Sequence, residues 1–111
     1  MAKLADTQVG VGVVGAGTIG SVHVRNVAAR SDLRLCWVVD VDRSRAAALG
    51  EAHGARITTT LDDMLADPAV HVVVIASSTD AHEDNVLAAV RAHKAILCEK
   101  PIGNSLDGAR R

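Results

Sequence analysis

The sequence predicts an α/β fold in which helices cover both faces of a doubly wound parallel sheet. Short runs rich in Val and Ile alternate with helical stretches along the chain. Hydrophobic residues make up 49% of the 111 residues, and the chain has no Phe or Tyr and one Trp. The core must therefore be built from branched aliphatic side chains, which are typical of parallel strands buried on both faces.

The first half of the chain is predicted to form strand, helix, strand, helix and strand. Val9–Val14 is an apolar run of strand length, and Thr18–Ala29 has helical spacing. Four residues of this helix are expected to share one face: Ile19, Val22, Asn26 and Val27. Leu33–Val39 is the second strand, Arg43–Ala52 an alanine-rich helix, and Arg56–Thr58 a weak third strand.

A short helix is expected to begin at Thr60. Asp63, three residues further on, gives nearly the spacing of a capping box, and Pro68 ends the helix. The apolar run Val70–Ile75 is the fourth strand.

The remaining predicted elements are the helix Ala81–Ala92, the strand Ala95–Cys98 and a further helix capped by Ser105. Strict alternation of strands and helices requires right-handed crossovers between parallel strands. We therefore expect a single domain over residues 1–111 with strand order 3-2-1-4-5.

The stretch VVGAGTIG places Gly15, Gly17 and Gly20 in G-x-G-x-x-G spacing between the first strand and the first helix. There the first glycine permits a tight turn, the second lets a pyrophosphate approach the backbone, and the third lets the helix pack closely on the strand. The free N–H groups at the helix start attract phosphate, so Thr18 and Ile19 are candidates as well. A role in the turn alone is the alternative.

An acidic residue at the end of the second strand favours dinucleotide binding over a turn alone. Asp40 stands twenty residues beyond Gly20, where a carboxylate can accept hydrogen bonds from the adenosine ribose. The combination predicts a Rossmann-type fold. Asp40 and Asp42 would repel a 2′-phosphate, so NAD is expected and NADP is less favoured, although Arg43 could reach a phosphate.

Small and polar residues follow the fourth strand. The carboxyl ends of parallel strands face the ligand crevice, so we expect Ala76, Ser77, Ser78 and Thr79 beside the cofactor. Thr79 could instead cap the next helix. His82 lies in the first turn of that helix, where the dipole favours a neutral imidazole. The spacing of the neighbouring acidic residues matches no metal motif, so no metal site is expected.

Glu99 and Lys100 follow the fifth strand at the same edge, in the stretch CEKP. Lys100 is expected to point into the crevice, where an ammonium could hydrogen-bond a substrate hydroxyl and stabilise negative charge as its proton leaves. A lysine before a proline at a strand end is often simply solvated, and this alternative stays open.

Charge and composition argue against several classes of protein. A net charge of −1 gives no basic field for nucleic acid, and one aromatic residue gives little stacking surface. No apolar segment has the length of a signal-peptide core or a membrane span. Cys36 and Cys98 lie in apolar runs without ligand spacing. We expect a cytoplasmic protein with two buried, reduced thiols and no nucleic-acid or membrane partner.

The segments GAGTIGSVHVRNV, VVDVDRSRA and VVVIASSTDAHEDNVLAAVRAHKAILCEKPI resemble the Gfo/Idh/MocA oxidoreductases over nearly the whole chain, and the EKP element is the most distinctive. By this resemblance Lys100 contacts substrate and nicotinamide. The residues implied to bind or line the dinucleotide are Gly15, Gly17, Gly20, Asp40, Ser77, Thr79, His82 and Glu99. The family often has proline at the position of Ser78, so a looser turn is expected there.

The ending EKPI and Asp40 look most like the inositol 2-dehydrogenases of this family, which oxidise a ring hydroxyl of myo-inositol with NAD. The resemblance implies an N-terminal NAD-binding domain that lacks the family's sixth strand and C-terminal domain. It also implies a small polyol or sugar as substrate, a homo-oligomeric full-length form, and an inactive short chain. Two alternatives stay open: a non-catalytic NAD-binding module that needs a partner chain, and an NADP-dependent sugar or sugar-phosphate dehydrogenase of the same family.

Overall fold

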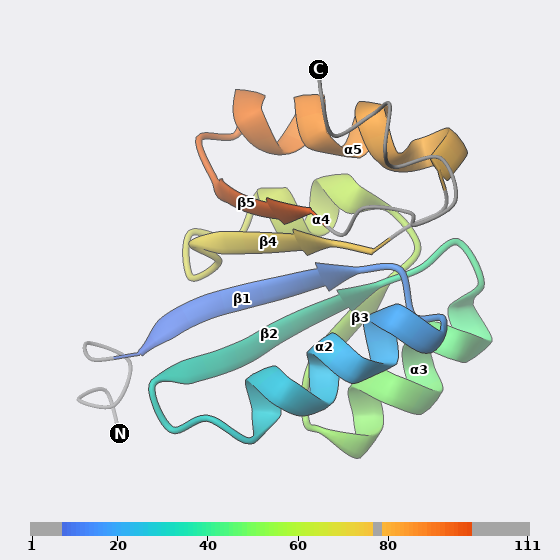
Figure 1. Cartoon of the computed structure of the whole chain (residues 1–111), viewed down its shortest axis with the longest axis vertical. Helices are drawn as coiled ribbons and strands as arrows, with labels where there is room; N and C mark the ends of the chain where they lie inside the picture. The colour runs from blue at the N-terminus through green and yellow to red at the C-terminus, as the bar shows by residue number, and fades with distance from the viewer. Residues whose placement is uncertain (1–7, 77–78, 99–111) are drawn as a thin grey trace, which may run out of the picture.

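The computed structural model describes residues 8–76 and 79–98, except for the side chains of residues 79–82 and 98. Strands and helices alternate as predicted (Figure 1). The strands are β1 (Val9–Val14), β2 (Leu33–Val39), β3 (Arg56–Thr58), β4 (Val72–Ile75) and β5 (Ala95–Cys98). The helices are α2 (Thr18–Ala28), α3 (Arg43–Ala52), α4 (Leu61–Leu65) and α5 (Thr79–Arg91).

The strands form one parallel sheet in the order β3-β2-β1-β4-β5, which confirms the predicted topology. The chain winds outward from β1 through β2 to β3, then crosses back and winds the other way through β4 to β5. The direction therefore reverses between β1 and β4. In open sheets of this kind, ligands bind beyond the carboxyl ends of the strands at such a reversal.

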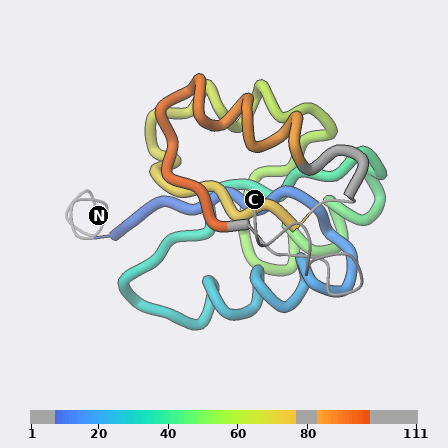
Figure 2. Tube along the Cα trace, turned by 45° about the horizontal axis from the view of Figure 1, so that its top comes forward, coloured from blue at the N-terminus to red at the C-terminus, as the bar shows by residue number. Residues whose placement is uncertain are grey.

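Helices cover both faces of the sheet. α2 and α3 contact β1, β2 and β3 on one side, whereas α5 packs on β4 and β5 from the other (Figures 1 and 2). Two apolar cores result. The first contains Val11, Val13, Ala16, Val24, Val27, Leu35, Val38, Ala46 and Val74. The second contains Val14, Trp37, Val39, Met64, Val70, Val73, Ile75 and Ala89.

The predicted face of α2 is wrong in part. Ile19 and Val22 have 50% and 41% of their surface exposed, and Asn26 is exposed as well. The residues that α2 buries are Gly20, Val24 and Val27. Their spacing of four and then three residues is helical. The hydrophobic pattern missed this face because Gly20, which marks its first turn, has no side chain to count as apolar.

Four predicted boundaries, in three elements, shift by one or two residues. α2 ends at Ala28, and α5 runs from Thr79 to Arg91. β4 begins at Val72, whereas Val70, predicted as its first residue, lies before the strand with a buried side chain. Val70 is fully buried and continues the apolar run, but it does not pair with a neighbouring strand. The sequence pattern placed it in the strand because it is apolar.

Thr60 is the N-cap residue of α4, but the predicted capping box does not form. Asp63 Oδ2 instead accepts hydrogen bonds from the hydroxyls of Thr58 at 2.7 Å and Thr60 at 3.1 Å. These bonds, that from Thr58 first, lower the pKa of the Asp63 carboxyl. They also fix the connection from β3 to α4, which borders the site described below.

Cys36 carries a free thiol, as expected, but it is half-buried rather than buried. Desolvation raises the pKa of this thiol, so it stays protonated at neutral pH. The side chain of Cys98 lies outside the described residues. Within the described part of the chain, no helix is long and apolar enough to cross a membrane.

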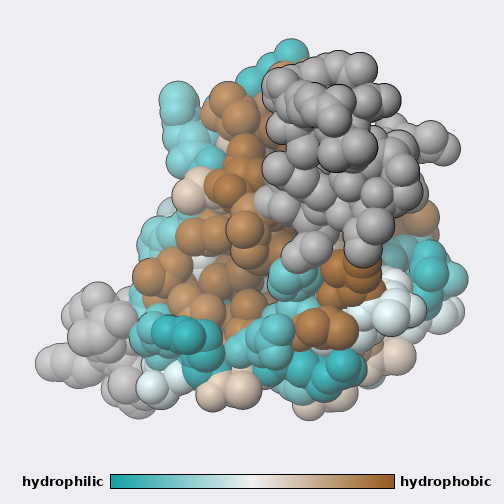
Figure 3. Space-filling model, viewed as in Figure 1, coloured by the Kyte–Doolittle hydropathy of each residue, from teal (hydrophilic) through white to brown (hydrophobic). Residues whose placement is uncertain are grey.

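An apolar groove lies along the sheet beside α2. It is lined by Val11, Val27, Leu33, Val72, Val74 and Leu97, with His23, Asn26 and Arg30 as polar members. Figure 3 shows hydrophobic side chains gathered between α5 and α2 on this side of the molecule. Leu97 of β5 is 51% exposed there.

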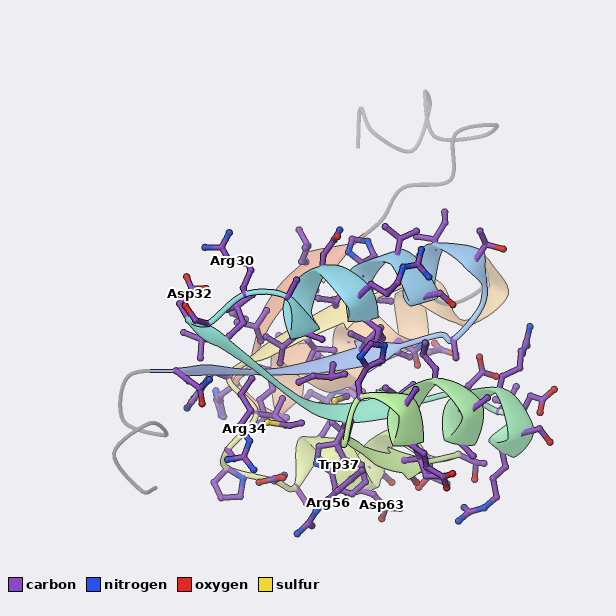
Figure 4. The ribbon with its side chains drawn as sticks, turned by 90° about the horizontal axis from the view of Figure 1, so that it is seen from below. Arg30, Asp32, Arg34, Trp37, Arg56 and Asp63 are labelled. Carbon is purple, nitrogen blue, oxygen red and sulfur yellow. The ribbon has the colours of Figure 1, made fainter. Side chains whose placement is uncertain are left out.

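Trp37 anchors the far end of the second core. Its indole N–H donates to Asp67 Oδ2 at 2.9 Å, and the guanidinium of Arg56 lies 5.6 Å from the ring centroid (Figure 4). The ammonium of Lys94 donates to the carbonyl oxygens of Asp67 and Val70 at 3.0 and 2.7 Å. These contacts join β2, β3 and the turn before β5 to the turn between α4 and β4.

Asp67→Asn should make the protein less stable at neutral pH but not in acid. The Trp37 N–H and then the Ala69 N–H lower the pKa of Asp67, so its contribution is present above the usual carboxyl pKa and is lost as pH falls through the lowered value. We expect the free energy of unfolding at pH 7 to fall by about 0.5–1 kcal/mol. The loss is small because the amide oxygen of Asn can still accept the Trp37 hydrogen bond, without the charge that strengthens it. Urea unfolding at pH 7 and at about pH 2, well below the usual carboxyl pKa, measures it.

Glu51→Gln, which neutralises an exposed carboxylate of α3, is the control for the loss of one negative charge. An Asp67→Asn deficit that is the same size at both pH values would contradict this role for the Asp67 charge.

Candidate functional site

The carboxyl ends of β1, β2 and β4 meet at one edge of the sheet. Beyond the strands, the Gly15 N–H donates to the Val39 carbonyl at 2.7 Å and the Ala76 N–H donates to the Val14 carbonyl at 2.8 Å. The ladder therefore continues for one more residue on each side of β1. It holds the start of the glycine turn, the end of β2 and the end of β4 together at the reversal of the sheet.

The glycine turn has the geometry that the sequence predicts. Gly15 has φ +100°, a left-handed conformation that L side chains rarely adopt. A Cβ on Gly20 would lie 1.6 Å from the Gly15 carbonyl oxygen, so only glycine lets α2 approach the turn this closely. A Cβ on Gly17 would meet no atom within 4 Å, so the backbone is open on that side.

The amino end of α2 faces the opening above Gly17. Gly17 is the N-cap residue, no side chain caps it, and the first turn has no acidic residue. The N–H groups of a first helical turn lack intrahelical acceptors and carry the positive end of the helix dipole. This arrangement suits a phosphate, and the open space at Gly17 lets one approach the backbone.

Asp40 is the one buried acidic residue in the described part of the chain, with 8% of its surface exposed. Its Oδ2 accepts a hydrogen bond from the Ala16 N–H at 2.7 Å, and its Oδ1 accepts one from the Asp42 N–H at 2.8 Å. A carboxylate can accept about four hydrogen bonds. A third, longer contact comes from Arg45 Nη2 at 3.5 Å to Asp40 Oδ1. Asp40 therefore braces the glycine turn and still has a lone pair for a ribose hydroxyl.

A cavity of about 310 Å³ connects these groups. Of the predicted site residues it is lined by Gly15, Gly17, Asp40 and Ala76, with Val14 and Val39 as apolar wall. Its volume lies at the lower end for small-molecule sites, and its mixture of apolar walls and few polar groups is typical of them. Among the described residues, no group of three His, Cys, Asp or Glu side chains could hold a metal ion.

Sequence analysis missed five residues that also line the cavity: Val41, Arg45, Thr59, Leu61 and Asn85. Thr59 and Leu61 come after the end of β3, and they line the cavity because β3 lies beside β2 in the sheet. Asn85 lies in the second turn of α5. That it lines the cavity follows only from how this helix packs on the sheet. Arg45 carried no sequence signal that distinguishes it from Arg43, because both lie in the first turn of α3.

Arg43 was predicted to reach a phosphate, but it is exposed and does not line the cavity; Arg45 does. Residues two apart on a helix point to different sides, so the two arginines cannot both face the site. Thr18 and Ile19 lie in the first turn of α2 with exposed side chains and do not line the cavity either. The side chains of Ser77, Ser78, Thr79, His82, Glu99 and Lys100 lie outside the described residues.

The geometry at this edge fits a dinucleotide. Gly17 and the start of α2 would face the pyrophosphate, Asp40 would receive the adenosine ribose, and the apolar wall beyond Val39 would face the adenine. The described residues that carry this fit come from β1, β2 and the turns that follow them.

Comparison with known proteins agrees with this geometry. The family model described as "Oxidoreductase family, NAD-binding Rossmann fold", GFO_IDH_MocA, matches residues 9–111. Inositol 2-dehydrogenase 2 of Saccharopolyspora erythraea is 41% identical over 103 residues, which cover 91% of this chain and 30% of that protein.

Two solved structures give the same result. GenD2 from gentamicin A biosynthesis, in complex with NAD, superposes with a TM-score of 0.84 at 41% identity. The match covers 93% of this chain and 30% of the GenD2 chain. Myo-inositol dehydrogenase from Lactobacillus casei, in complex with NAD(H) and myo-inositol, gives a TM-score of 0.80 at 32% identity, covering 94% and 32%. The chain thus spans about 30% of the length of these relatives.

Gly17→Ala and Gly20→Ala should separate cofactor binding from folding. At Gly17 the new methyl group has open space, so stability should fall by less than about 1 kcal/mol, while the methyl group obstructs the pyrophosphate and NAD affinity should fall about tenfold or more. At Gly20 the methyl group meets backbone, and stability should fall by about 1–3 kcal/mol. Urea unfolding and calorimetric titration with NAD measure the two effects.

Unchanged NAD affinity in a folded Gly17→Ala variant would mean that the pyrophosphate does not approach this turn. A Gly20→Ala variant as stable as the original would contradict the close contact between α2 and the Gly15 carbonyl.

Proposed function

This chain belongs to the Gfo/Idh/MocA oxidoreductases, with their NAD-binding Rossmann fold, and we propose that it forms the NAD-binding part of a polyol dehydrogenase. The substrate class that we favour is a ring polyol such as myo-inositol. Because the chain spans about 30% of the relatives' length, the remaining substrate contacts are expected in the rest of a longer protein.

The observation that carries this proposal is the pairing of Asp40 with the glycine turn. A buried carboxylate bonded to the Ala16 N–H, next to an open Gly17 backbone, supplies acceptors for a ribose and donors for a pyrophosphate within one cavity. NAD, when bound, supplies the hydride acceptor for oxidation of a carbinol carbon. The side chains of this chain orient it and do not themselves change oxidation state.

We assign Lys100 to the substrate hydroxyl. The pairing of Ile75 with Cys98 places the carboxyl end of β5 level with that of β4, at the edge where the cavity lies. A lysine ammonium near this edge can donate a hydrogen bond to the hydroxyl that loses its proton and can stabilise the developing negative charge. In this proposal Glu99 and His82 line the nicotinamide end.

The names of the relatives favour inositol over other polyols. Inositol 2-dehydrogenase is the name of relatives that are 35–41% identical to this chain over most of its length. A sugar substrate within the same family is the second candidate, because the residues that choose the substrate lie mostly outside the described part of the chain.

Lys100→Met in the full-length protein should lower kcat by about 10²–10⁴-fold, because the ammonium that assists removal of the hydroxyl proton is gone. The Kd for NAD should not change, since the cavity around Asp40 is untouched. Initial rates of NADH formation with myo-inositol and with aldose sugars, together with titration calorimetry, measure both quantities. Arg91→Met, which removes an exposed cation at the end of α5, is the matched control.

Full activity in Lys100→Met would overturn its assignment. An original protein that binds NAD but oxidises no polyol or sugar would favour a non-catalytic module instead.

A further inference from the structure

Two polar side chains are buried in the described part of the chain, those of Asp40 and Thr58. Thr58 ends β3, and its carbonyl oxygen accepts a hydrogen bond from the Asp40 N–H at 3.2 Å. We propose that Thr58 is a positioning residue for the adenosine end of the cofactor: it does not line the cavity, but it fixes the turn after β3 that does. The inference rests on the proposed function, because it assumes that NAD occupies the cavity, and it adds a role for a residue outside the lining.

The hydroxyl of Thr58 organises the turn between β3 and α4. Its Oγ1 accepts a hydrogen bond from the Thr60 N–H at 3.1 Å and donates one to Asp63 Oδ2 at 2.7 Å. The same Asp63 oxygen accepts a bond from the Thr60 hydroxyl at 3.1 Å, and Figure 4 labels this aspartate. Thr59 and Leu61, the two cavity-lining residues of this connection, lie on either side of Thr60. The hydroxyl network therefore holds the residue between them.

Burial makes the conformation of the turn depend on this hydroxyl. Thr58 has 6% of its surface exposed, so water cannot readily replace the partners of its side chain. Without the hydroxyl, the Thr60 N–H loses its acceptor and Asp63 loses one of two hydroxyl donors. A turn with an unpaired N–H is stabilised by rearranging until that group finds another partner. Thr59 and Leu61 would move with it.

The main chain of Thr58 connects the turn to the rest of the cavity. Its carbonyl holds the Asp40 backbone, and the Asp40 carboxylate in turn accepts the hydrogen bond from the Ala16 N–H. One series of hydrogen bonds thus runs from the turn after β3, through the carboxylate assigned to the ribose, to the glycine turn. A ligand that binds a site already ordered in this way avoids the free-energy cost of ordering it. Loosening one end should therefore weaken NAD binding.

The test measures the Kd for NAD by titration calorimetry in the protein that carries this chain, at a temperature where thermal unfolding shows each variant to be folded. Thr58→Val, which has nearly the same size but no hydroxyl, should raise the Kd about three- to tenfold, the change expected from the loss of about one hydrogen bond. The Kd for ADP-ribose should rise by the same factor, because that ligand keeps the adenosine end and lacks nicotinamide.

Thr58→Ser keeps the hydroxyl and should bind NAD within about twofold of the original. This rescue separates the hydroxyl from the packing of the methyl group, since Thr58→Ser loses the methyl group and Thr58→Val keeps both methyl positions filled. An unchanged Kd in Thr58→Val, or a Thr58→Ser variant as weak as Thr58→Val, would overturn the proposal.

Asp63→Ala tests the same network from the surface, where the side chain is exposed and the core stays intact even if Thr58→Val does not fold. It should also weaken NAD binding, whereas Asp62→Ala, which removes the neighbouring exposed carboxylate of α4, should not. Combined with Thr58→Val, Asp63→Ala should add less than its separate effect, because both changes break the same hydrogen bond.

Equal Kd values for NAD in Asp63→Ala and Asp62→Ala, or effects that multiply in full in the double variant, would overturn the proposal. An original protein that does not bind NAD would instead refute the proposed function.

Discussion

The hydrogen bond from the Ala16 N–H to the Asp40 carboxylate joins the two halves of the site. At 2.7 Å and buried, it fixes the turn after β1 to the residue after β2. A buried carboxylate needs partners to offset its desolvation, and here the backbone of the turn supplies one. The group that would receive the ribose therefore also shapes the loop that would receive the pyrophosphate.

The second constraint is the absence of a side chain at Gly20. Its Cα faces the Gly15 carbonyl so closely that α2 begins directly above the turn. This places the positive end of the helix dipole at the mouth of the cavity. The short distance matters, because the effect of the dipole falls off within about one helical turn. Binding of an anion and close packing of α2 on β1 are thus two consequences of one contact.

The sequence was sufficient for features that depend on local residue type. The alternation of Val- and Ile-rich runs with helical stretches gave the strand order, and the spacing from Gly20 to Asp40 gave the centre of the site. Features that depend on packing were not accessible. Ile19 and Val22 were placed on one face of α2 because they are apolar, but Gly20, Val24 and Val27 face the sheet. Arg43 was named as a candidate and Arg45 was not, because the orientation of a helix about its axis cannot be derived from charge alone.

In the proposed function, the described residues would recognise the adenosine end of the cofactor, which takes no part in hydride transfer. Affinity and reactivity are therefore set by different elements. Affinity would depend on the turns after β1 and β2, which hydrogen-bond to one another. In the same proposal, reactivity would depend on the residues that follow β4 and β5 in the sequence and on the rest of a longer protein. A substrate change can then arise by altering the second set, while the ladder from Gly15 to Val39 and the carboxylate of Asp40 stay as they are.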